Sequence, residues 1–169
     1  MTVDSFKYLP RIIATYYRMT AGEPELPIPW NHLPKALEQC TFGLVTTGGL
    51  YLRGVQLPFD VERERAEPTW GDPTYRSLPS DVQQEDIGIS HLHINTEDAL
   101  KDVNILLPVH RFRYLVAEGR IGRLARSAYS FMGYQGFPAD TSAWRETYVP
   151  LVAAELHSEG ADCVFLTPA

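Results

Sequence analysis

The residues best suited to chemistry are two histidines one residue apart, His91 and His93, in the segment IGISHLHINTEDALKDVNILLP. On a strand, side chains repeat every two residues, so both imidazoles and Asn95 would share one face. Such a pair can bind zinc if a third ligand converges, and Asp98 or Asp102 could supply a carboxylate. Alternatively, the neutral rings hydrogen-bond a substrate or a loop, or they are satisfied by backbone in a structural role.

A second candidate is the turn at the end of FGLVTTGGL, which contains Thr46, Thr47, Gly48 and Gly49. A buried strand that runs into a glycine-containing turn is how open α/β sheets present backbone N–H groups to ligands. The alternative is a tight turn that simply needs a glycine with positive φ.

The two cysteines do not suggest a nucleophile. Cys163 falls in an apolar run expected to be a buried strand, where a thiol has a raised pKa and is inert. Cys40 precedes a strand and has no evident activating neighbour. The sequence contains no GxSxG, GxGxxG or GxxxxGK[ST] motif, so neither a serine-hydrolase elbow nor a classical nucleotide site is expected, and we predict no cofactor.

Alternating strands and helices must position these residues. We predict strands at Phe42–Leu50, through His91–Asn95, at Val103–Leu107, at the start of Ser130–Gly136 and at Cys163–Thr167. We predict helices at Val109–Gly119, at Thr141–Ser158 with a kink at Pro150, and a short helix or turn at Ile121–Tyr129. Residues 51–80 show little pattern and are expected to form a long loop of the kind that is often functional. The alternation predicts an α/β fold of three layers, a mostly parallel sheet flanked by helices, Rossmann-like but without a classical dinucleotide site.

Composition limits the class of protein. The 169 residues predict a single α/β domain, in which residues 1–40 form an N-terminal helix plus a proline-rich arm over Gly22–Pro34. Pro10 either weakens the first turn of that helix or delays its start. The net charge of -6 argues against a nucleic-acid partner. No apolar stretch approaches the roughly 20 residues of a membrane span, and no signal peptide is evident. We therefore expect a cytoplasmic protein with no membrane partner.

Five blocks, in order, carry a resemblance: FGLVTTGGLYLRG, GDPTYRSLP, SHLHINTEDALKDVNILLP, RFRYLVAEGRIGRLARSAYSFMGYQG and GADCVFLTPA. They resemble the selenoprotein B family of glycine, sarcosine, betaine and D-proline reductases, in its shorter stand-alone bacterial branch. The resemblance covers most of Phe42–Ala169. It implies reductive cleavage of a small amino-acid-like substrate by a thiol or selenol.

The resemblance also implies where the nucleophile belongs. The family's closing strand is similar to VDAVLLTP and is followed by the redox selenocysteine or cysteine. Thr167 and Pro168 match that lead-in, and Ala169 matches the residue before the nucleophile, which this chain lacks. We expect a truncation at a UGA codon read as stop; the alternative is a protein that naturally lacks the redox residue.

The site implied by the resemblance lies at the carboxyl edge of the sheet. Its substrate-binding candidates are Thr46, Thr47, Gly48, His91, His93, Asn95, Tyr129, Met132 and Thr167. The expected catalytic residue follows Ala169, so the chain as it stands should be inactive in the redox step. Three functions stay open: a reductase component B-like protein, a non-redox small-molecule-binding or accessory subunit, and a metal-dependent lyase or hydrolase using the histidines. The expected partners are a small-molecule substrate and either further copies of the chain or a reductase subunit.

Overall fold

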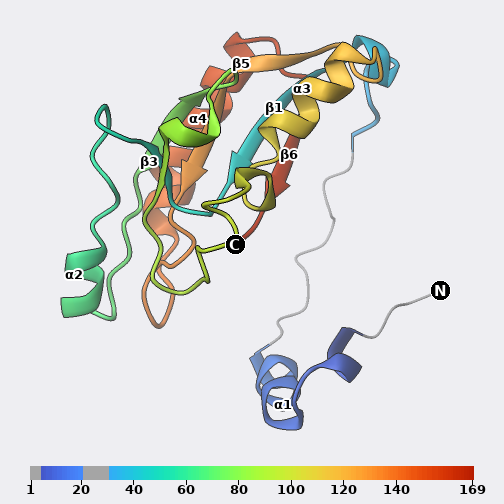
Figure 1. The fold of residues 1–169 in the computed structure, drawn as a ribbon. Coiled ribbons are helices and arrows are strands. Elements are labelled where there is room, and N and C mark those ends of the chain that lie inside the picture. Colours follow the sequence, from blue (N-terminus) through green and yellow to red (C-terminus); the bar gives the residue numbers. More distant parts are fainter. Residues whose placement is uncertain (1–4, 21–30) are drawn as a thin grey trace. The chain divides into compact units, whose positions relative to one another are not determined.

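The computed structural model describes residues 5–20 and 31–169 (Figure 1). The chain divides into two compact units, Met1–His32 and Leu33–Ala169. In the first unit, the 3-10 helix η1 (Ser5–Tyr8) precedes α1 (Arg11–Thr20). α1 begins directly after Pro10, which confirms the late start expected from a residue that cannot continue a helix on its N-terminal side. Most of the proline-rich arm predicted over Gly22–Pro34 lies outside the described residues.

The second unit is built on a four-stranded sheet in the order β3-β5-β1-β6. β1 (Thr41–Thr46) runs parallel to both of its neighbours, β5 (Arg123–Phe131) and β6 (Cys163–Thr167). β3 (Tyr75–Pro79) pairs antiparallel with β5 at one edge. A small antiparallel ladder joins β2 (Leu50–Leu52) to β4 (Ile87–Ile89).

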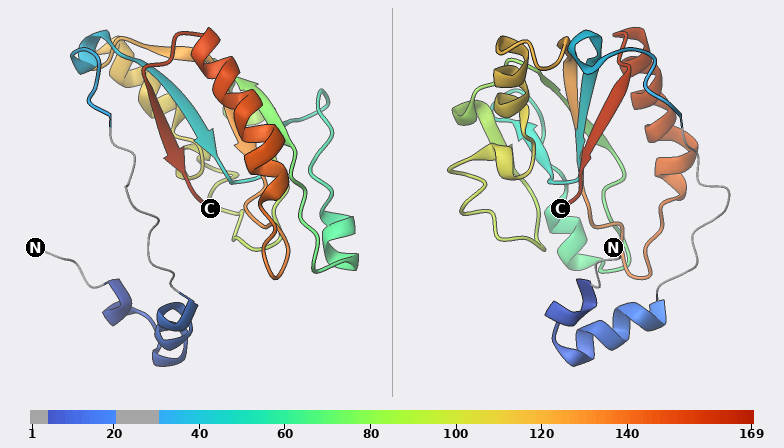
Figure 2. Two further views of the ribbon diagram at one scale, coloured as in Figure 1. Left: turned by 180° about the vertical axis from the view of Figure 1, so that it is seen from behind. Right: turned by 90° about the vertical axis from the view of Figure 1, so that its right-hand side faces the viewer.

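Helices cover both faces of this sheet (Figure 2). α3 (Val109–Ala117) lies on one face, and α4 (Val149–Ser158) lies on the other. The predicted three-layer, mostly parallel α/β fold is therefore confirmed. Shorter helices occupy the connections: η2 (Leu37–Gln39), α2 (Val61–Ala66), η3 (Gln84–Asp86), η4 (Val103–Ile105) and the π-helical turn η5 (Trp144–Tyr148).

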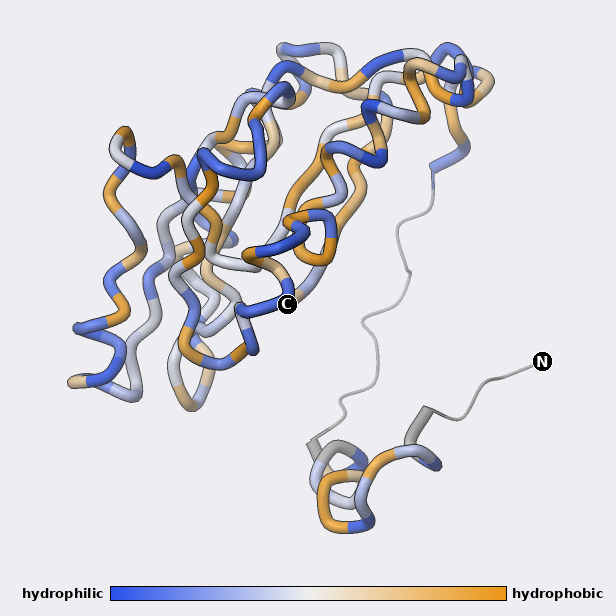
Figure 3. Tube along the Cα trace, viewed as in Figure 1, coloured by the Kyte–Doolittle hydropathy of each residue, from blue (hydrophilic) through white to orange (hydrophobic). Residues whose placement is uncertain are grey.

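Each face of the sheet buries its own core, as strand alternation requires. Leu44, Leu107 and Phe112 belong to the larger core on the α3 side. Tyr129 and Leu156 belong to the smaller core beneath α4. Hydropathy follows this arrangement, since β1 and β6 are hydrophobic and α2 is hydrophilic (Figure 3).

Several predicted elements differ from the structure. The helix or turn expected at Ile121–Tyr129 is wrong, because β5 covers most of it and pairs with strands on both sides. The strand expected at Val103–Leu107 is wrong as well. A 3-10 helix replaces it, because the Asp102 carboxylate accepts from the Asn104 N–H and caps it.

The strand expected through His91–Asn95 is also wrong, since β4 ends at Ile89 and the histidines lie in a bend. The strand expected at Phe42–Leu50 ends at Thr46, where the glycine turn begins. Residues 51–80 are more ordered than expected, since they contain the end of β2, α2 and β3.

Other predicted elements are confirmed. The final strand runs from Cys163 to Thr167, and the helix predicted from Val109 ends at Ala117. The burial expected for that strand is wrong, because β6 is an edge strand and Val164, Phe165 and Leu166 are exposed. The helix expected over Thr141–Ser158 begins at Ser142 and widens into a π-turn just before Pro150, which has no N–H to donate to the preceding turn.

Candidate functional site

The parallel strands end together at one edge of the sheet, next to the chain end marked C in Figure 1. Thr47, just past β1, donates its N–H to the Thr167 carbonyl of β6 at 3.2 Å. The Ala169 N–H in turn donates to Thr47 Oγ1 at 2.8 Å. Gly48 bridges to Met132, which follows β5. The structure thus brings together four of the predicted positions, with Thr46 directly beneath them in β1.

The turn after β1 uses its own N–H groups. The Gly48 N–H donates to Thr46 Oγ1 at 3.1 Å, and the Gly49 N–H donates to the Phe131 carbonyl at 2.9 Å. Gly49 has φ of 67°, and a Cβ there would lie 2.3 Å from the Ser90 carbonyl oxygen. The turn is therefore a tight, positive-φ connection, and these N–H groups do not face a ligand.

His91 lies beside this turn with only 9% of its surface exposed. Its Nδ1 accepts the backbone N–H of His93 at 3.1 Å, so the neutral ring carries its proton on Nε2. Burial, together with the neighbouring His93, lowers the pKa of His91 and keeps the ring neutral. Nε2 is buried and has no hydrogen-bond partner, a state that costs about 1–3 kcal/mol for a buried donor.

Gly133 faces His91 Nε2. A Cβ at Gly133 would lie 3.2 Å from that nitrogen, 2.7 Å from the Ala169 carbonyl oxygen and 3.1 Å from the Thr47 carbonyl oxygen. The absence of a side chain at Gly133 therefore allows three segments to meet at the edge. The hydroxyl oxygen of Thr167, Oγ1, is also buried and also lacks a hydrogen-bond partner.

His93 pairs with Glu64 of α2. Its Nε2 lies 2.8 Å from Glu64 Oε1, and its ring stacks on Tyr134 with centroids 4.2 Å apart. The Glu64 side chain is almost fully buried, and burial raises its pKa in spite of the bond to His93. The two histidine rings still lie near each other, with centroids 6.1 Å apart.

The carboxylates considered as further metal ligands have other partners. Asp98 pairs with Lys101, and Asp102 accepts from Asn104. Asn95 is exposed, and its side chain accepts from the Glu97 N–H. Within residues 5–20 and 31–169, no three His, Cys, Asp or Glu side chains converge as a metal site would require.

Tyr129 does not lie with the other candidates. It is buried in the core beneath α4, and burial together with Glu155 raises its pKa. The cysteines lie at the opposite end of the sheet, where Cys163 begins β6 and Cys40 precedes β1. Burial and the nearby Cys40 thiol raise the pKa of Cys163, which does not favour its thiolate form.

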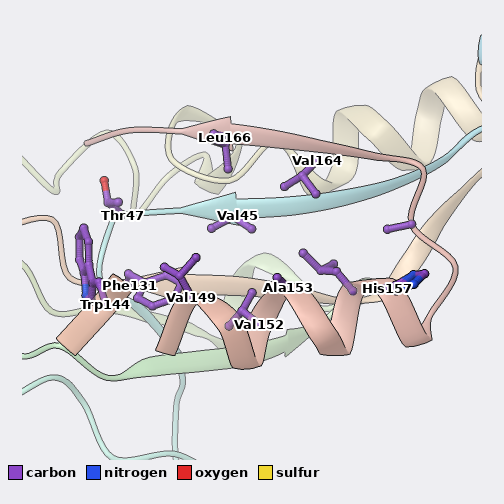
Figure 4. Close-up of a pocket in the computed structure, with 12 residues that line it drawn as sticks. Val45, Thr47, Phe131, Trp144, Val149, Val152, Ala153, His157, Val164 and Leu166 are labelled. Carbon is purple, nitrogen blue, oxygen red and sulfur yellow. The ribbon is translucent and has the colours of Figure 1, made fainter. Parts of the chain in front are cut away.

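An apolar cavity of about 460 Å³ lies between α4 and the faces of β1 and β6 that point toward it (Figure 4). Thr47 and Trp144 stand at one end, and His157 stands at the other (Figure 4). Val164 and Leu166 of β6 are exposed above it. Such a lining suits an apolar group, whereas the edge beside His91 suits a polar one.

Sequence reasoning missed one residue of the edge, Glu64. Gly133 and Tyr134 lie in the Tyr129–Tyr134 segment that was expected to line the edge, but nothing local showed that they contact His91 and His93. Glu64 lies in the stretch interpreted as a patternless loop, among other charged residues that are exposed. The one available signal was the length of that loop, which is itself typical of functional segments.

Among the described residues, no helix combines the length and the apolar character that crossing a bilayer requires.

Comparison with known proteins gives consistent matches. Residues 15–169 match the family described as glycine/sarcosine/betaine reductase selenoprotein B. The chain is 32% identical over 145 residues to D-proline reductase subunit gamma of Acetoanaerobium sticklandii, covering 85% of this chain and 55% of that protein. It is 29% identical over 149 residues to glycine reductase complex component B subunit gamma of Carboxydothermus hydrogenoformans, covering 85% of this chain and 32% of that protein. No solved structure matches significantly.

The fold and its polar edge define an open-sheet α/β protein of three layers. The family match extends over nearly the whole chain, and the chain belongs to the selenoprotein B family of glycine, sarcosine and betaine reductases. This confirms the resemblance carried by the five sequence blocks. The chain spans about half the length of the D-proline reductase subunit and about a third of the glycine reductase subunit.

Proposed function

We propose that this chain is a component B-like part of a reductase that cleaves a small amino-acid-like substrate with a selenol or thiol. The relatives are named as subunits of D-proline and glycine reductases, which supports both the reaction class and the presence of partner subunits. The redox residue in this proposal is not among residues 1–169. By resemblance to the family pattern, the proposal puts it directly after the position of Ala169.

The observation that carries the proposal is the bond between Ala169 N–H and Thr47 Oγ1, 2.8 Å long. It holds the backbone that leads to the proposed nucleophile against the turn after β1. Gly133 and His91 lie beside the same backbone. A side chain one residue further on would therefore begin at the carboxyl edge, where ligands of open α/β sheets bind.

The proposed step balances with a dithiol as reductant. The selenolate or thiolate attacks the carbon that carries the amine, and the C–N bond breaks with its electron pair on nitrogen, which takes up a proton. One thiol of the dithiol then attacks the sulfur or selenium that carries the carbon fragment. The carbon leaves with the bonding electron pair and takes up a proton, and a disulfide or selenenylsulfide remains. The second thiol of the dithiol breaks this disulfide or selenenylsulfide, which restores the thiol or selenol and leaves the dithiol oxidised by two electrons.

The test supplies the nucleophile. A variant with one cysteine appended after Ala169 is assayed, with the organism's own reductase subunits and dithiothreitol, for reduction of glycine, sarcosine, betaine and D-proline. The matched control ends in serine. Reduction with cysteine alone supports the proposal, and no reduction of any substrate counts against it. The reading frame beyond the codon for Ala169 gives an independent check, because a cysteine or selenocysteine codon there would supply the proposed residue and its absence would count against the proposal.

A second candidate function is binding without redox chemistry, as an accessory subunit. The position of both cysteines at the far end of the sheet favours it, because neither thiol can reach the edge beside His91. Exposed Val164 and Leu166 on the edge strand β6 favour association with a partner subunit or a second copy. Thermal shift with the same four substrates, together with the oligomeric state by light scattering, separates this function from the first. The metal-dependent alternative has no converging third ligand among the described residues and is not carried further.

A further inference from the structure

His91 is buried beside the turn after β1 and has one ring nitrogen without a hydrogen-bond partner. It is 9% exposed, and its Nε2 makes no hydrogen bond, although its Nδ1 is paired with the His93 N–H at 3.1 Å. Buried polar atoms in native proteins are nearly always paired, so an isolated one calls for a missing partner. The hydrogen bond at Nδ1 fixes the tautomer, and Nε2 is therefore a donor.

The surroundings of His91 hold the ring in place. The Ser90 N–H donates to the Gly49 carbonyl at 2.8 Å, and Ser90 Oγ donates to the Phe59 carbonyl at 3.0 Å. On the other side, His93 is held by Glu64 and stacks on Tyr134. The ring thus cannot easily turn to find a partner elsewhere, and the donor is fixed before a ligand arrives.

The donor faces the backbone at Gly133. A Cβ there would come within 3.2 Å of Nε2, so the absence of a side chain lets this segment pass close to the nitrogen. The Thr167 hydroxyl, which also lies buried without a partner, is a second donor at this edge. No described residue accepts a hydrogen bond from His91 Nε2, so an acceptor from outside them would complete its hydrogen bonding.

We propose that His91 donates Nε2–H to an anionic acceptor bound at the carboxyl edge, either the carboxylate of a small amino acid or the thiolate or selenolate of the redox residue. This role rests on the proposed function, but it is one of binding and positioning and needs no turnover. A donor of this kind stabilises the charged form of its partner. It therefore tightens the binding of a carboxylate, or it lowers the pKa of a thiol.

The first arm of the test uses the chain as it is. Glycine, sarcosine and D-proline are titrated in an NMR experiment that follows the imidazole nitrogens of His91, with glycinamide as the uncharged counterpart of glycine. If the carboxylate is the acceptor, the Nε2 resonance shifts on binding, and the amino acid binds about tenfold or more tightly than the amide. His91→Phe should abolish this difference, and His91→Gln, which can place an N–H near Nε2, should retain part of it.

The second arm uses the chain with one cysteine appended after Ala169, with a serine-ended chain to subtract alkylation of Cys40 and Cys163. If the thiolate is the acceptor, its alkylation begins at lower pH in the wild-type background than with His91→Phe. His157→Gln, at the far end of the apolar cavity, is the control for a histidine change that leaves the edge intact.

Either positive arm supports the proposal and identifies the acceptor. If the carboxylate and the amide bind alike, or not at all, and the thiol pKa is unchanged by His91→Phe, the proposal is overturned. The NMR spectrum of the wild-type protein gives a test that does not depend on whether the variants fold. If it shows the His91 ring protonated on Nδ1 instead of Nε2, the proposal is overturned without any mutation. A positive binding arm with no reduction of any substrate would leave this inference standing and refute only the proposed function.

Discussion

Replacing Gly133 with alanine tests the geometry of the edge directly. The new Cβ would lie 2.7 Å from the Ala169 carbonyl oxygen and 3.1 Å from that of Thr47, and both of these atoms belong to the backbone. The clash can be relieved at the lower free-energy cost if Ala169 moves. This movement breaks its hydrogen bond to Thr47 Oγ1 and costs about 1 kcal/mol. If the turn moves instead, the cost rises to about 3 kcal/mol, as in other overpacked sites.

The assay is thermal unfolding combined with the imidazole NMR signals of His91. At roughly 2–4 °C per kcal/mol, a loss of about 1–3 kcal/mol lowers the unfolding midpoint by about 2–12 °C. Because the new Cβ also comes within 3.2 Å of Nε2, the His91 signals should shift in Gly133→Ala. An unchanged midpoint together with unchanged His91 signals would refute the reasoning.

Gly122→Ala is the matched control for this prediction. Its Cβ would lie 2.8 Å from the Cys40 carbonyl oxygen, a backbone clash of similar severity near the opposite end of the sheet. It should destabilise the protein to a similar degree and leave the His91 signals in place. If both variants shift His91 equally, the change at Gly133 reports general loosening and not a contact at the edge.

Three pH-dependent predictions follow from the buried and paired groups, each measured by thermal unfolding. Burial raises the folded-state pKa of Glu64, so the stability tied to its protonated form is lost as the pH rises. Glu64→Gln should therefore gain on the wild type as the pH rises above 4.5, and a constant gap would contradict this. The backbone hydrogen bond from Thr41 lowers the pKa of Asp162, so Asp162→Asn should be less stable than the wild type at neutral pH and approach it as the pH falls below about 4. Burial lowers the pKa of His91, so the wild type should lose stability relative to His91→Gln as the pH falls below 6.5, and parallel curves would argue against a neutral buried ring.

The parts of the fold that the sequence predicts well are those with a local signal. Cys163–Thr167 is a short apolar run, and the strand has those limits, beginning three residues after Gly160 and ending directly before Pro168. The segment Arg123–Tyr129 misled the prediction, because its arginines and alanines favour a helix. Pairing with β1 and β3 on both sides overrides that preference, since strand formation depends on neighbours that are distant in sequence.

The candidate site shows the same division. The spacing of His91 and His93 correctly indicated two imidazoles close together, but for the wrong reason, since a bend closed by the His93 N–H replaces the expected strand. Glu64, the partner of His93, comes from a helix 29 residues earlier in the chain. No periodicity in the sequence could reveal a contact that depends on how α2 packs against that bend.

Strand β6 contributes residues both to the apolar cavity beneath α4 and to the polar edge beside His91. On one face, Phe165 packs on Phe112 of α3, with ring centroids 5.2 Å apart. On the other, Val164 and Leu166 line the apolar cavity and are 47% and 67% exposed. Its last residue, Thr167, is bonded through its carbonyl to Thr47 and so belongs to the edge beside His91. Any group that covers the cavity would therefore also contact the strand that positions the edge, because β6 is only five residues long and joins the two.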